Sequence, residues 1–310
     1  FIEKLGINYI PIEDITSYPS ILGGRVKTLH PKVFGGILNR RNKKEDQKEL
    51  LDYEIPQIDL VIVDLYPFEE TIRSTKNEKE IIEKIDIGGI SLIRAAAKNY
   101  NDVLCISDKS DYGDLLRILK NTGAQTTIDI RKKYGVKAFD VSSNYDTAIF
   151  NFFNKDNLIN SLKISSKNYT PLRYGENPHQ KGAFYGDLNK NILQIHGKQI
   201  SYNNLLDIDN AINLISEFKK AKPTFGILKH NNACGISSKK SISLAYKNAL
   251  KSDPISAFGG VLVSNTEIDF ETAKLLKKLF FEVLIAPKFK KNAIELLKEK
   301  KNLIIVKNNI

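Results

Sequence analysis

Three side chains with reactive chemistry fall close together in the segment LKHNNACG, residues 228–235: Lys229, His230 and Cys234. The whole chain has only four histidines and two cysteines, so this concentration is unusual for the sequence. Four interpretations are open: a metal site, a cysteine nucleophile, an acid–base pair and a buried turn. A zinc site needs three or four ligands at suitable spacing, and this segment offers at most two.

The acid–base interpretation fits these residues best. A nucleophilic cysteine needs an activated thiolate, whereas Cys234 beside Gly235 is also explained by a small packed side chain. Lys229 and His230 stand at the C-terminal end of a predicted strand, and a neutral histidine accepts a proton near pH 7. Asn231 adds neutral hydrogen-bonding groups at the same place.

A second candidate is GGRVKTLHPKVFGG, residues 23–36, in which two glycine pairs flank Arg25, Lys27 and Thr28. Glycine lets the backbone approach a ligand closely, and arginine and lysine donate to phosphate or carboxylate groups. The alternative is a surface turn with ordinary basic residues.

The motif DLYPF, residues 64–68, follows a predicted strand and brings Asp64 and Tyr66 to its C-terminal end. Ligands of open α/β sheets bind at that edge. Tyr66 is therefore a candidate for proton transfer, against the alternative of a half-buried packing residue.

The motif IDIGGISLIRAAAKN, residues 85–99, places Asp86 before Gly88 and Gly89 at a predicted helix start, with Lys98 near its end. Backbone N–H groups of such a turn can hold an anion or a developing oxyanion. The alternative, which residue chemistry alone favours, is structural: Asp86 caps the helix, and Lys98 interacts with the negative end of the helix dipole.

The segment LRYGENPHQKGAFY, residues 172–185, is rich in side chains that bind rather than pack, among them Arg173, Tyr174 and His179. This composition favours a structured binding loop.

The segment SDPISAFGG, residues 252–260, adds Ser256 and Phe258 before a glycine pair. A flat ligand can stack on Phe258, and an ordinary turn is the alternative.

These candidates lie on two successive blocks of alternating strand and helix patterns, which predict an α/β fold with two domains. The first block predicts strands over 58–68 and 103–107 and helices over 78–85, 91–99, 112–123 and 128–154. The second predicts strands over 224–230, 259–265, 281–287 and 303–307 and helices over 241–252, 269–279 and 292–301. A polar stretch predicts the division into domains 1–153 and 171–310, joined by a linker over 154–170.

The composition narrows the class of protein. With 42% hydrophobic and 27% charged residues, no apolar run of membrane-spanning length and no signal peptide, the sequence predicts a cytoplasmic globular protein. The net charge of +11 predicts anionic partners, which include nucleic acids, membrane surfaces and phosphorylated or carboxylated metabolites. No nucleic-acid-binding motif supports the first of these.

The chain contains no methionine and begins at Phe1. We expect it to be a fragment of a longer gene product.

Taken in order, the motifs GGRVKTLHPK, LYPFEETI, IDIGG with RAAAKN, LRYGENPHQ, KHNNACG and SDPISAFGG closely resemble a bifunctional family of purine biosynthesis enzymes, which catalyses the last two steps to inosine monophosphate (IMP). The resemblance covers essentially the whole chain. It implies a methylglyoxal-synthase-like, Rossmann-like N-terminal domain followed by a cytidine-deaminase-like α/β subdomain.

The resemblance implies that the N-terminal domain is an IMP cyclohydrolase, which closes the formylated ribotide FAICAR to IMP. The implied catalytic residues are Lys27, Tyr66, Asp86 and Lys98. The implied substrate-binding positions are Arg25, Thr28, Asp64, Gly88 and Gly89. Asp64 departs from the asparagine that is frequent in the family.

The resemblance also implies that the C-terminal part belongs to a formyltransferase, which moves a formyl group from 10-formyltetrahydrofolate to the amine of AICAR. Lys229 and His230 are the implied catalytic pair. The implied substrate-binding positions are Arg173, Tyr174, His179, Asn231, Ser256 and Phe258. The zinc signature of deaminases is absent, so no catalytic metal is implied, and a structural monovalent cation is left open.

The family is homodimeric and shares its transformylase sites between subunits, so the implied partners are a second copy, the nucleotides and folate, with neither nucleic acid nor membrane. Its Ser/Thr/Gly-rich phosphate loop would precede the present sequence, and its second transformylase subdomain would follow it. We therefore expect this piece alone to lack formyltransferase activity. A basic nucleic-acid-binding module and an inactive scaffold of the same fold remain as alternatives.

Overall fold

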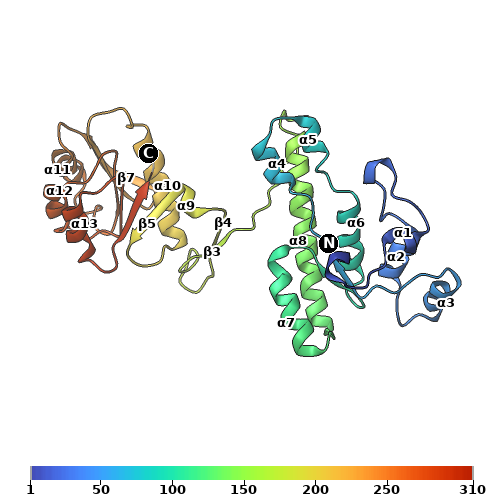
Figure 1. Ribbon diagram of the computed structural model, residues 1–310. Helices are drawn as coiled ribbons and strands as arrows, with labels where there is room; N and C mark the ends of the chain where they lie inside the picture. Colours follow the sequence, from blue (N-terminus) through green and yellow to red (C-terminus); the bar gives the residue numbers. More distant parts are fainter. Residues whose placement is uncertain (1, 309–310) are drawn as a thin grey trace. The chain divides into compact units, whose positions relative to one another are not determined.

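The computed structural model describes residues 2–308, which form two compact units. The change from unit 1 to unit 2 falls between Ser165 and Ser166, within the polar stretch 154–170 (Figure 1). Both units combine helices with a sheet, which confirms the predicted α/β class. No helix in the described residues is long and apolar enough to cross a membrane.

Unit 1 has a small parallel sheet and eight helices among its described residues. The strands, which pair with each other, are β1 (Leu60–Ile62) and β2 (Leu104–Ile106). The helices are α1 (Ile12–Thr16), α2 (Pro31–Leu38), α3 (Lys44–Asp52), α4 (Phe68–Ser74), α5 (Glu78–Ile82), α6 (Gly88–Lys98), α7 (Tyr112–Thr122) and α8 (Ile128–Phe153). Short 3-10 turns cover Glu3–Leu5, Leu22–Gly24 and Lys109–Asp111.

Helix α6 is the central element of unit 1. Its residues Ile93, Ala96 and Ala97 are buried, and they pack with side chains of α2, both strands and α8. The small alanines let neighbouring elements approach closely. The packing fixes the N-terminal end of α6, where Gly88 begins the helix, relative to the strand ends.

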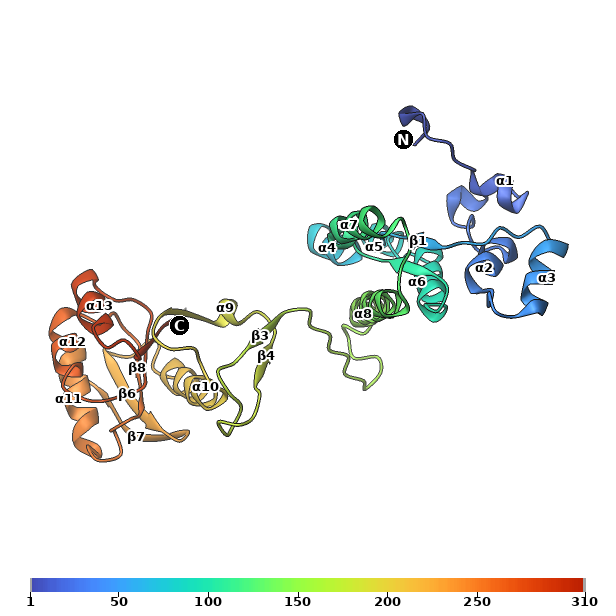
Figure 2. The same cartoon turned by 90° about the horizontal axis from the view of Figure 1, so that it is seen from below.

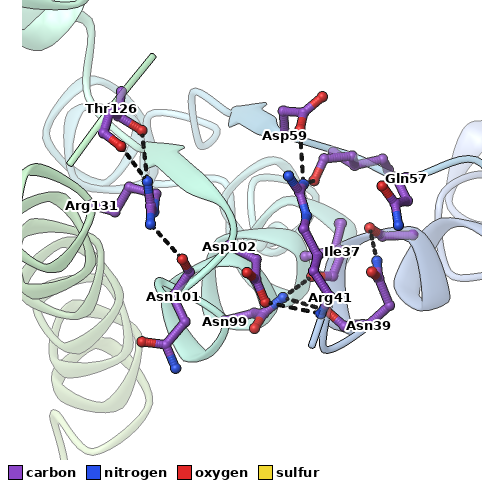
Figure 3. Close-up of polar contacts among 12 residues, drawn as sticks. Ile37, Asn39, Arg41, Gln57, Asp59, Asn99, Asn101, Asp102, Thr126 and Arg131 are labelled. Atoms are coloured by element: carbon purple, nitrogen blue, oxygen red, sulfur yellow. Dashed lines mark hydrogen bonds and ion pairs between the residues drawn. The ribbon is translucent and has the colours of Figure 1, made fainter. Parts of the chain in front are cut away.

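Asn99, the residue after α6, joins the end of this helix to the end of α2 through its buried side chain (Figure 3). Its amide donates to the carbonyl oxygens of Ile37 at 2.8 Å and Asn39 at 2.9 Å. Beside it, the guanidinium of Arg41 contacts Asp59 at 2.8 Å, and its backbone N–H donates to Asp102 at 3.3 Å. The two bonds from Asn99 satisfy carbonyl oxygens at the end of α2, where the last carbonyls of a helix have no partner within it.

The replacement Asn99→Ala is expected to lower the free energy of unfolding by about 2–4 kcal/mol, because two buried carbonyl oxygens lose their donor. Urea unfolding of the variant and the wild type measures this difference. The exposed neighbour replacement Asn101→Ala, which removes no side-chain hydrogen bond seen among the described residues, is the matched control and should change stability by less than about 0.5 kcal/mol.

Unit 2 contains a six-stranded sheet in the order β5-β10-β9-β8-β6-β7, and the pairs β10–β9 and β9–β8 are parallel. Its strands are β5 (Ile192–His196), β6 (Thr224–Lys229), β7 (Asn232–Ser238), β8 (Val261–Ser264), β9 (Val283–Ala286) and β10 (Ile304–Asn308). Its helices are α9 (Leu188–Asn191), α10 (Tyr202–Ser216), α11 (Ile242–Ser252), α12 (Phe270–Leu276) and α13 (Lys291–Lys298). A separate hairpin pairs β3 (Tyr169–Pro171) with β4 (Ala183–Tyr185).

The two faces of this sheet carry separate cores, because successive strand residues point to opposite faces. Phe225 and Ile227 of β6 pack with α11, α12 and α13. Leu228 of β6 instead packs with Ile208 and Ile215 of α10. Figures 1 and 2 show α10 on one side of the sheet and the other three helices on the opposite side. Unit 2 is therefore a three-layer α/β/α arrangement.

Two elements near the candidate residues differ from the predictions. Helix α6 begins at Gly88 rather than near residue 91, so the glycine pair lies inside its first turn. The turn predicted at the end of the strand 224–230 is present at His230 and Asn231, but the chain then continues as strand β7, which the sequence pattern did not predict. The polar sequence of β7 does not show the pattern of a buried strand. This strand forms because it pairs antiparallel with the buried β6.

Two candidate active sites

A cleft of about 720 Å³ in unit 1 collects residues from three separate parts of the chain. Its walls come from the segments 23–29, 64–66 and 82–92. Of the residues predicted from the first three cyclohydrolase motifs, the lining includes Arg25, Lys27, Thr28, Asp64, Tyr66, Asp86, Gly88 and Gly89. The fold thus brings these motifs together at the N-terminal end of α6 and the C-terminal end of β1.

Asp86 and the glycine pair form one tight turn in this cleft. The backbone N–H of Gly89 donates to Asp86 Oδ1 at 2.6 Å. A Cβ atom on Gly89 would stand 2.5 Å from the same carboxylate, so a larger residue would displace Asp86. Asp86 therefore accepts from this N–H as a capping carboxylate, which is the alternative that residue chemistry alone favoured.

The two basic residues of the cleft each contact a glutamate. Lys27 Nζ lies 3.2 Å from the carboxylate of Glu13, and Arg25 forms an ion pair with Glu83. All four side chains are at least a third exposed, and exposed ion pairs stabilise proteins only weakly. An anionic or polarised substrate group can therefore exchange with either glutamate.

Two aromatic hydroxyls lie around the same cleft. The hydroxyl of Tyr112 donates to Asp64 Oδ2 at 2.6 Å, and this bond to Asp64 raises the pKa of Tyr112. Tyr66 is exposed, and Lys84 Nζ lies 5.7 Å from the centre of its ring. Sequence reasoning missed Tyr112 and Lys84, since neither belongs to one of the quoted motifs.

The structure does not bring Lys98 to this cleft. Lys98 is the last residue of α6 and is exposed, whereas the cleft lies at Gly88. Ten residues of helix separate the two positions by about 15 Å. The prediction that Lys98 acts beside Lys27, Tyr66 and Asp86 is not supported by this geometry.

In unit 2, His230 and Asn231 form the two-residue turn between the antiparallel strands β6 and β7. Both have left-handed backbone conformations, with φ of 50° and 65°. A two-residue hairpin with positive φ at both positions matches the right-handed twist of its strands, and asparagine tolerates this conformation. The turn leaves the imidazole exposed, next to the half-buried Lys229.

Helix α10 holds this turn from the side. The carboxylate of Asp207 accepts from the backbone N–H of Asn231 at 2.9 Å, and Asn210 donates to the side-chain oxygen of Asn231 at 3.0 Å. The start of the same helix meets the loop of the fourth motif, because the N–H of Tyr202 donates to the carbonyl of Tyr174 at 3.2 Å. Both candidate segments are thus tied to the first half of α10.

Within that loop, the guanidinium of Arg173 lies 5.2 Å from the centre of the Tyr174 ring. Arg173 and His179 are exposed, and Tyr174 is half-buried. The bond from the N–H of Gly175 to the carbonyl of Gln180, at 2.8 Å, closes the loop into a defined turn.

Lys229 links the turn of residues 230–231 to the sixth motif. Its Nζ donates to the carbonyl of Phe258 at 2.9 Å. Asp253 accepts from the N–H of Ser256 at 2.9 Å, and the pKa of Asp253 is lowered chiefly by its hydrogen bonds with Ser256, with a further contribution from the charge of Lys229. Sequence reasoning did not single out Asp253, although it lies within the quoted motif.

The geometry argues against a thiolate at Cys234. Burial raises the pKa of this thiol, and the negative charge of Asp253 raises it further. The thiol is therefore protonated at neutral pH and a poor nucleophile. Within residues 2–308, no three His, Cys, Asp or Glu side chains are grouped so that they could hold a metal ion.

If His230 acts in formyl transfer, as the family resemblance implies, the replacement Asp207→Ala should reduce the rate of formyl transfer about tenfold, because the turn loses a charged acceptor at Asn231. Steady-state formyl transfer by the whole protein measures it. Asp209→Ala removes a carboxylate from the same helix without touching the turn, and it should leave the rate within about twofold. An equal loss in both variants would mean that helix stability, rather than the turn, is responsible.

Comparison with known proteins places this chain in a family. Residues 96–310 match the model of the AICARFT/IMPCHase bienzyme, and residues 1–91 match that of the MGS-like domain, which confirms the fold predicted for the N-terminal part. A solved structure described as the crystal structure of ForH is 35% identical, covers 49% of this chain and 80% of its own, and superposes with a TM-score of 0.43.

Two curated relatives carry the name bifunctional purine biosynthesis protein PurH. The protein of Bacteroides thetaiotaomicron is 56% identical over 99% of this chain, and that of Acetivibrio thermocellus is 43% identical over 97%. The chain spans about 60% of the length of these relatives. Since the bienzyme model matches more than half of the sequence, the chain belongs to the AICARFT/IMPCHase bienzyme family.

Proposed function

We propose that the protein containing this chain carries out the last two steps of IMP synthesis: formyl transfer to AICAR, followed by ring closure of FAICAR. The observation that carries the proposal for unit 1 is the cleft that gathers Lys27, Tyr66 and Asp86 around one cavity. The proposal for unit 2 rests on the exposed Lys229–His230 pair and on family membership.

Ring closure requires the carboxamide nitrogen of FAICAR to attack the formyl carbon. The attack gives a ring carbon that carries a hydroxyl group, and this carbon then loses water as its bond to the ring nitrogen becomes double. The attacking nitrogen loses one proton as the formyl oxygen becomes a hydroxyl, and the former formamide nitrogen loses a second as the hydroxyl leaves as water, so both protons end on the departing oxygen. The ammonium of Lys27 can stabilise the negative charge that develops on the formyl oxygen. Tyr66 and Asp86 offer a hydroxyl and a carboxylate for the proton transfers.

Formyl transfer begins with attack by the 5-amino group of AICAR on the formyl carbon of 10-formyltetrahydrofolate. The tetrahedral intermediate collapses as the bond to N10 of the folate breaks, and N10 receives a proton. The amine is a weak nucleophile because its lone pair is delocalised into the imidazole ring. His230 is the proposed acceptor of its proton, and Lys229 the proposed stabiliser of the intermediate or of the leaving group.

The remaining assignments follow from the same proposal. We place the nucleotide in unit 1 against Arg25, Thr28, Asp64 and Gly88, and in unit 2 against Arg173, Tyr174 and His179. Asn231, Ser256 and Phe258 complete the proposed binding surface of unit 2. The co-substrate is 10-formyltetrahydrofolate, the assembly is a homodimer with shared transformylase sites, and the compartment is the cytoplasm.

Separate assays of the whole protein test the two steps. FAICAR alone should be converted to IMP, and AICAR with 10-formyltetrahydrofolate should give FAICAR and then IMP. Chromatography of the nucleotides measures both conversions. A protein that binds neither nucleotide, or that shows only salt-dependent binding to DNA or RNA, would contradict the proposal.

A further inference from the structure

A side chain from α8 supports the Asp86 turn, although it belongs to none of the motifs that define the site. The hydroxyl of Tyr145 donates to the carbonyl of Lys84 at 2.6 Å and accepts from the backbone N–H of Asp86 at 2.9 Å. These partners lie 61 and 59 residues away along the chain. One hydroxyl therefore makes two hydrogen bonds to the backbone that presents Asp86 to the cleft.

The ring of Tyr145 gives this hydroxyl a defined position. Tyr145 is 8% exposed and lies in a small core with Phe68 and Ile81. Its ring centre is 6.0 Å from that of Phe68, the first residue of α4. Because the ring is packed, the hydroxyl is held by the framework of α8 rather than by the cleft itself.

The segment 84–86 carries two groups that face the cleft residues. On one side, the Asp86 carboxylate accepts from the N–H of Gly89. On the other side, the Lys84 ammonium lies near the face of Tyr66. Loss of the two bonds to Tyr145 would free this segment to rotate, and both groups would move together.

We propose that Tyr145 is a positioning residue for the reaction of the unit 1 cleft, which orients Asp86 through the two hydrogen bonds that its hydroxyl makes with the backbone of Lys84 and Asp86. The inference rests on the proposed ring-closure function and adds to it a residue outside the quoted motifs. Tyr145 must remain protonated to donate to Lys84. Burial raises its pKa, so the hydroxyl stays neutral at physiological pH.

The variant Tyr145→Phe in the whole protein tests this role. It keeps the packed ring and removes only the hydroxyl. We expect kcat for ring closure to fall about 10- to 100-fold, because a misplaced catalytic group slows the chemical step, while KM stays within about twofold. Tyr134→Phe is the matched control, since Tyr134 is also buried on α8 but lies in a different core cluster. It should leave both constants unchanged.

A double variant separates positioning from general destabilisation. In an Asp86→Asn background, Tyr145→Phe should lower kcat by less than about twofold, because its effect acts through Asp86. A full additional loss in the double variant would overturn the proposal. So would an unchanged kcat in Tyr145→Phe when Asp86→Asn alone is impaired.

Hydrogen exchange gives a readout that does not depend on the reaction. Peptides that cover residues 84–89 should exchange faster in Tyr145→Phe than in the wild type or in Tyr134→Phe. Equal exchange in all three proteins would contradict the positioning role. A wild-type protein that closes no ring, with faster exchange in Tyr145→Phe, would instead overturn the proposed function and leave the structural contact intact.

Discussion

The replacement His230→Asn is expected to reduce formyl transfer by at least about 100-fold, since general acid–base catalysis contributes roughly 10²–10⁴-fold. Asparagine adopts the left-handed conformation that the turn requires at this position, where φ is 50°. The backbone of the turn and its bond to Asp207 should therefore persist. The loss then reports the missing imidazole rather than a distorted hairpin.

Ring closure supplies the internal control for His230→Asn. The same preparation should convert FAICAR to IMP at the wild-type rate, because the residues that line the cleft all belong to unit 1, whereas His230 belongs to unit 2. His230→Ala provides a second comparison, in which strain at a positive φ is added to the loss of the ring. Formyl transfer by His230→Asn within a few-fold of the wild type would remove His230 from the mechanism.

The replacement Lys27→Gln is expected to lower kcat for ring closure by about 10²–10³-fold. Loss of one group that stabilises a developing oxyanion has an effect of this size. Glutamine keeps much of the length and polarity of lysine but lacks the charge. The lining residues of the cleft include two basic side chains, Lys27 and Arg25, and Lys27 is the one that carries an ammonium group.

Lys98→Gln is the matched control for Lys27→Gln. It makes the same chemical change at the exposed, opposite end of α6. We expect ring closure by Lys98→Gln to stay within about threefold of the wild type, and formyl transfer to be normal in both variants. If Lys98→Gln lost as much ring-closure activity as Lys27→Gln, the conclusion that Lys98 lies too far from the cleft to take part in ring closure would be refuted.

Many secondary-structure elements were predictable, for local physical reasons. Helix α7, predicted over 112–123, ends at Thr122, and Gly123 caps it with a left-handed φ of 59°. Helix α8 follows its predicted span closely. The strands β6, β8 and β9 are short runs of buried apolar residues, which the sequence displays directly. Residues that are close together in the chain determine such elements, and so the sequence pattern alone is enough to predict them.

Other elements escaped prediction because long-range packing forms them. Strand β7 is polar and becomes a strand only beside β6. Helix α10 begins with a capping box at Ser201, and its apolar face is completed by the sheet against which it packs. The sequence contains these signals, but they are weak without the partner surface.

By itself, the sequence determined the α/β class, the family resemblance and the chemical types of the candidate residues, including Lys27, Asp86 and His230. Only the tertiary structure decided which of them share a cleft, that Lys98 lies at the far end of its helix, and that Gly89 N–H is already bonded to Asp86. It also revealed Tyr145 and Asp207. These two side chains act through hydrogen bonds to backbone groups 24 to 61 residues away, and a bond to a backbone amide leaves no pattern in the residue types it joins.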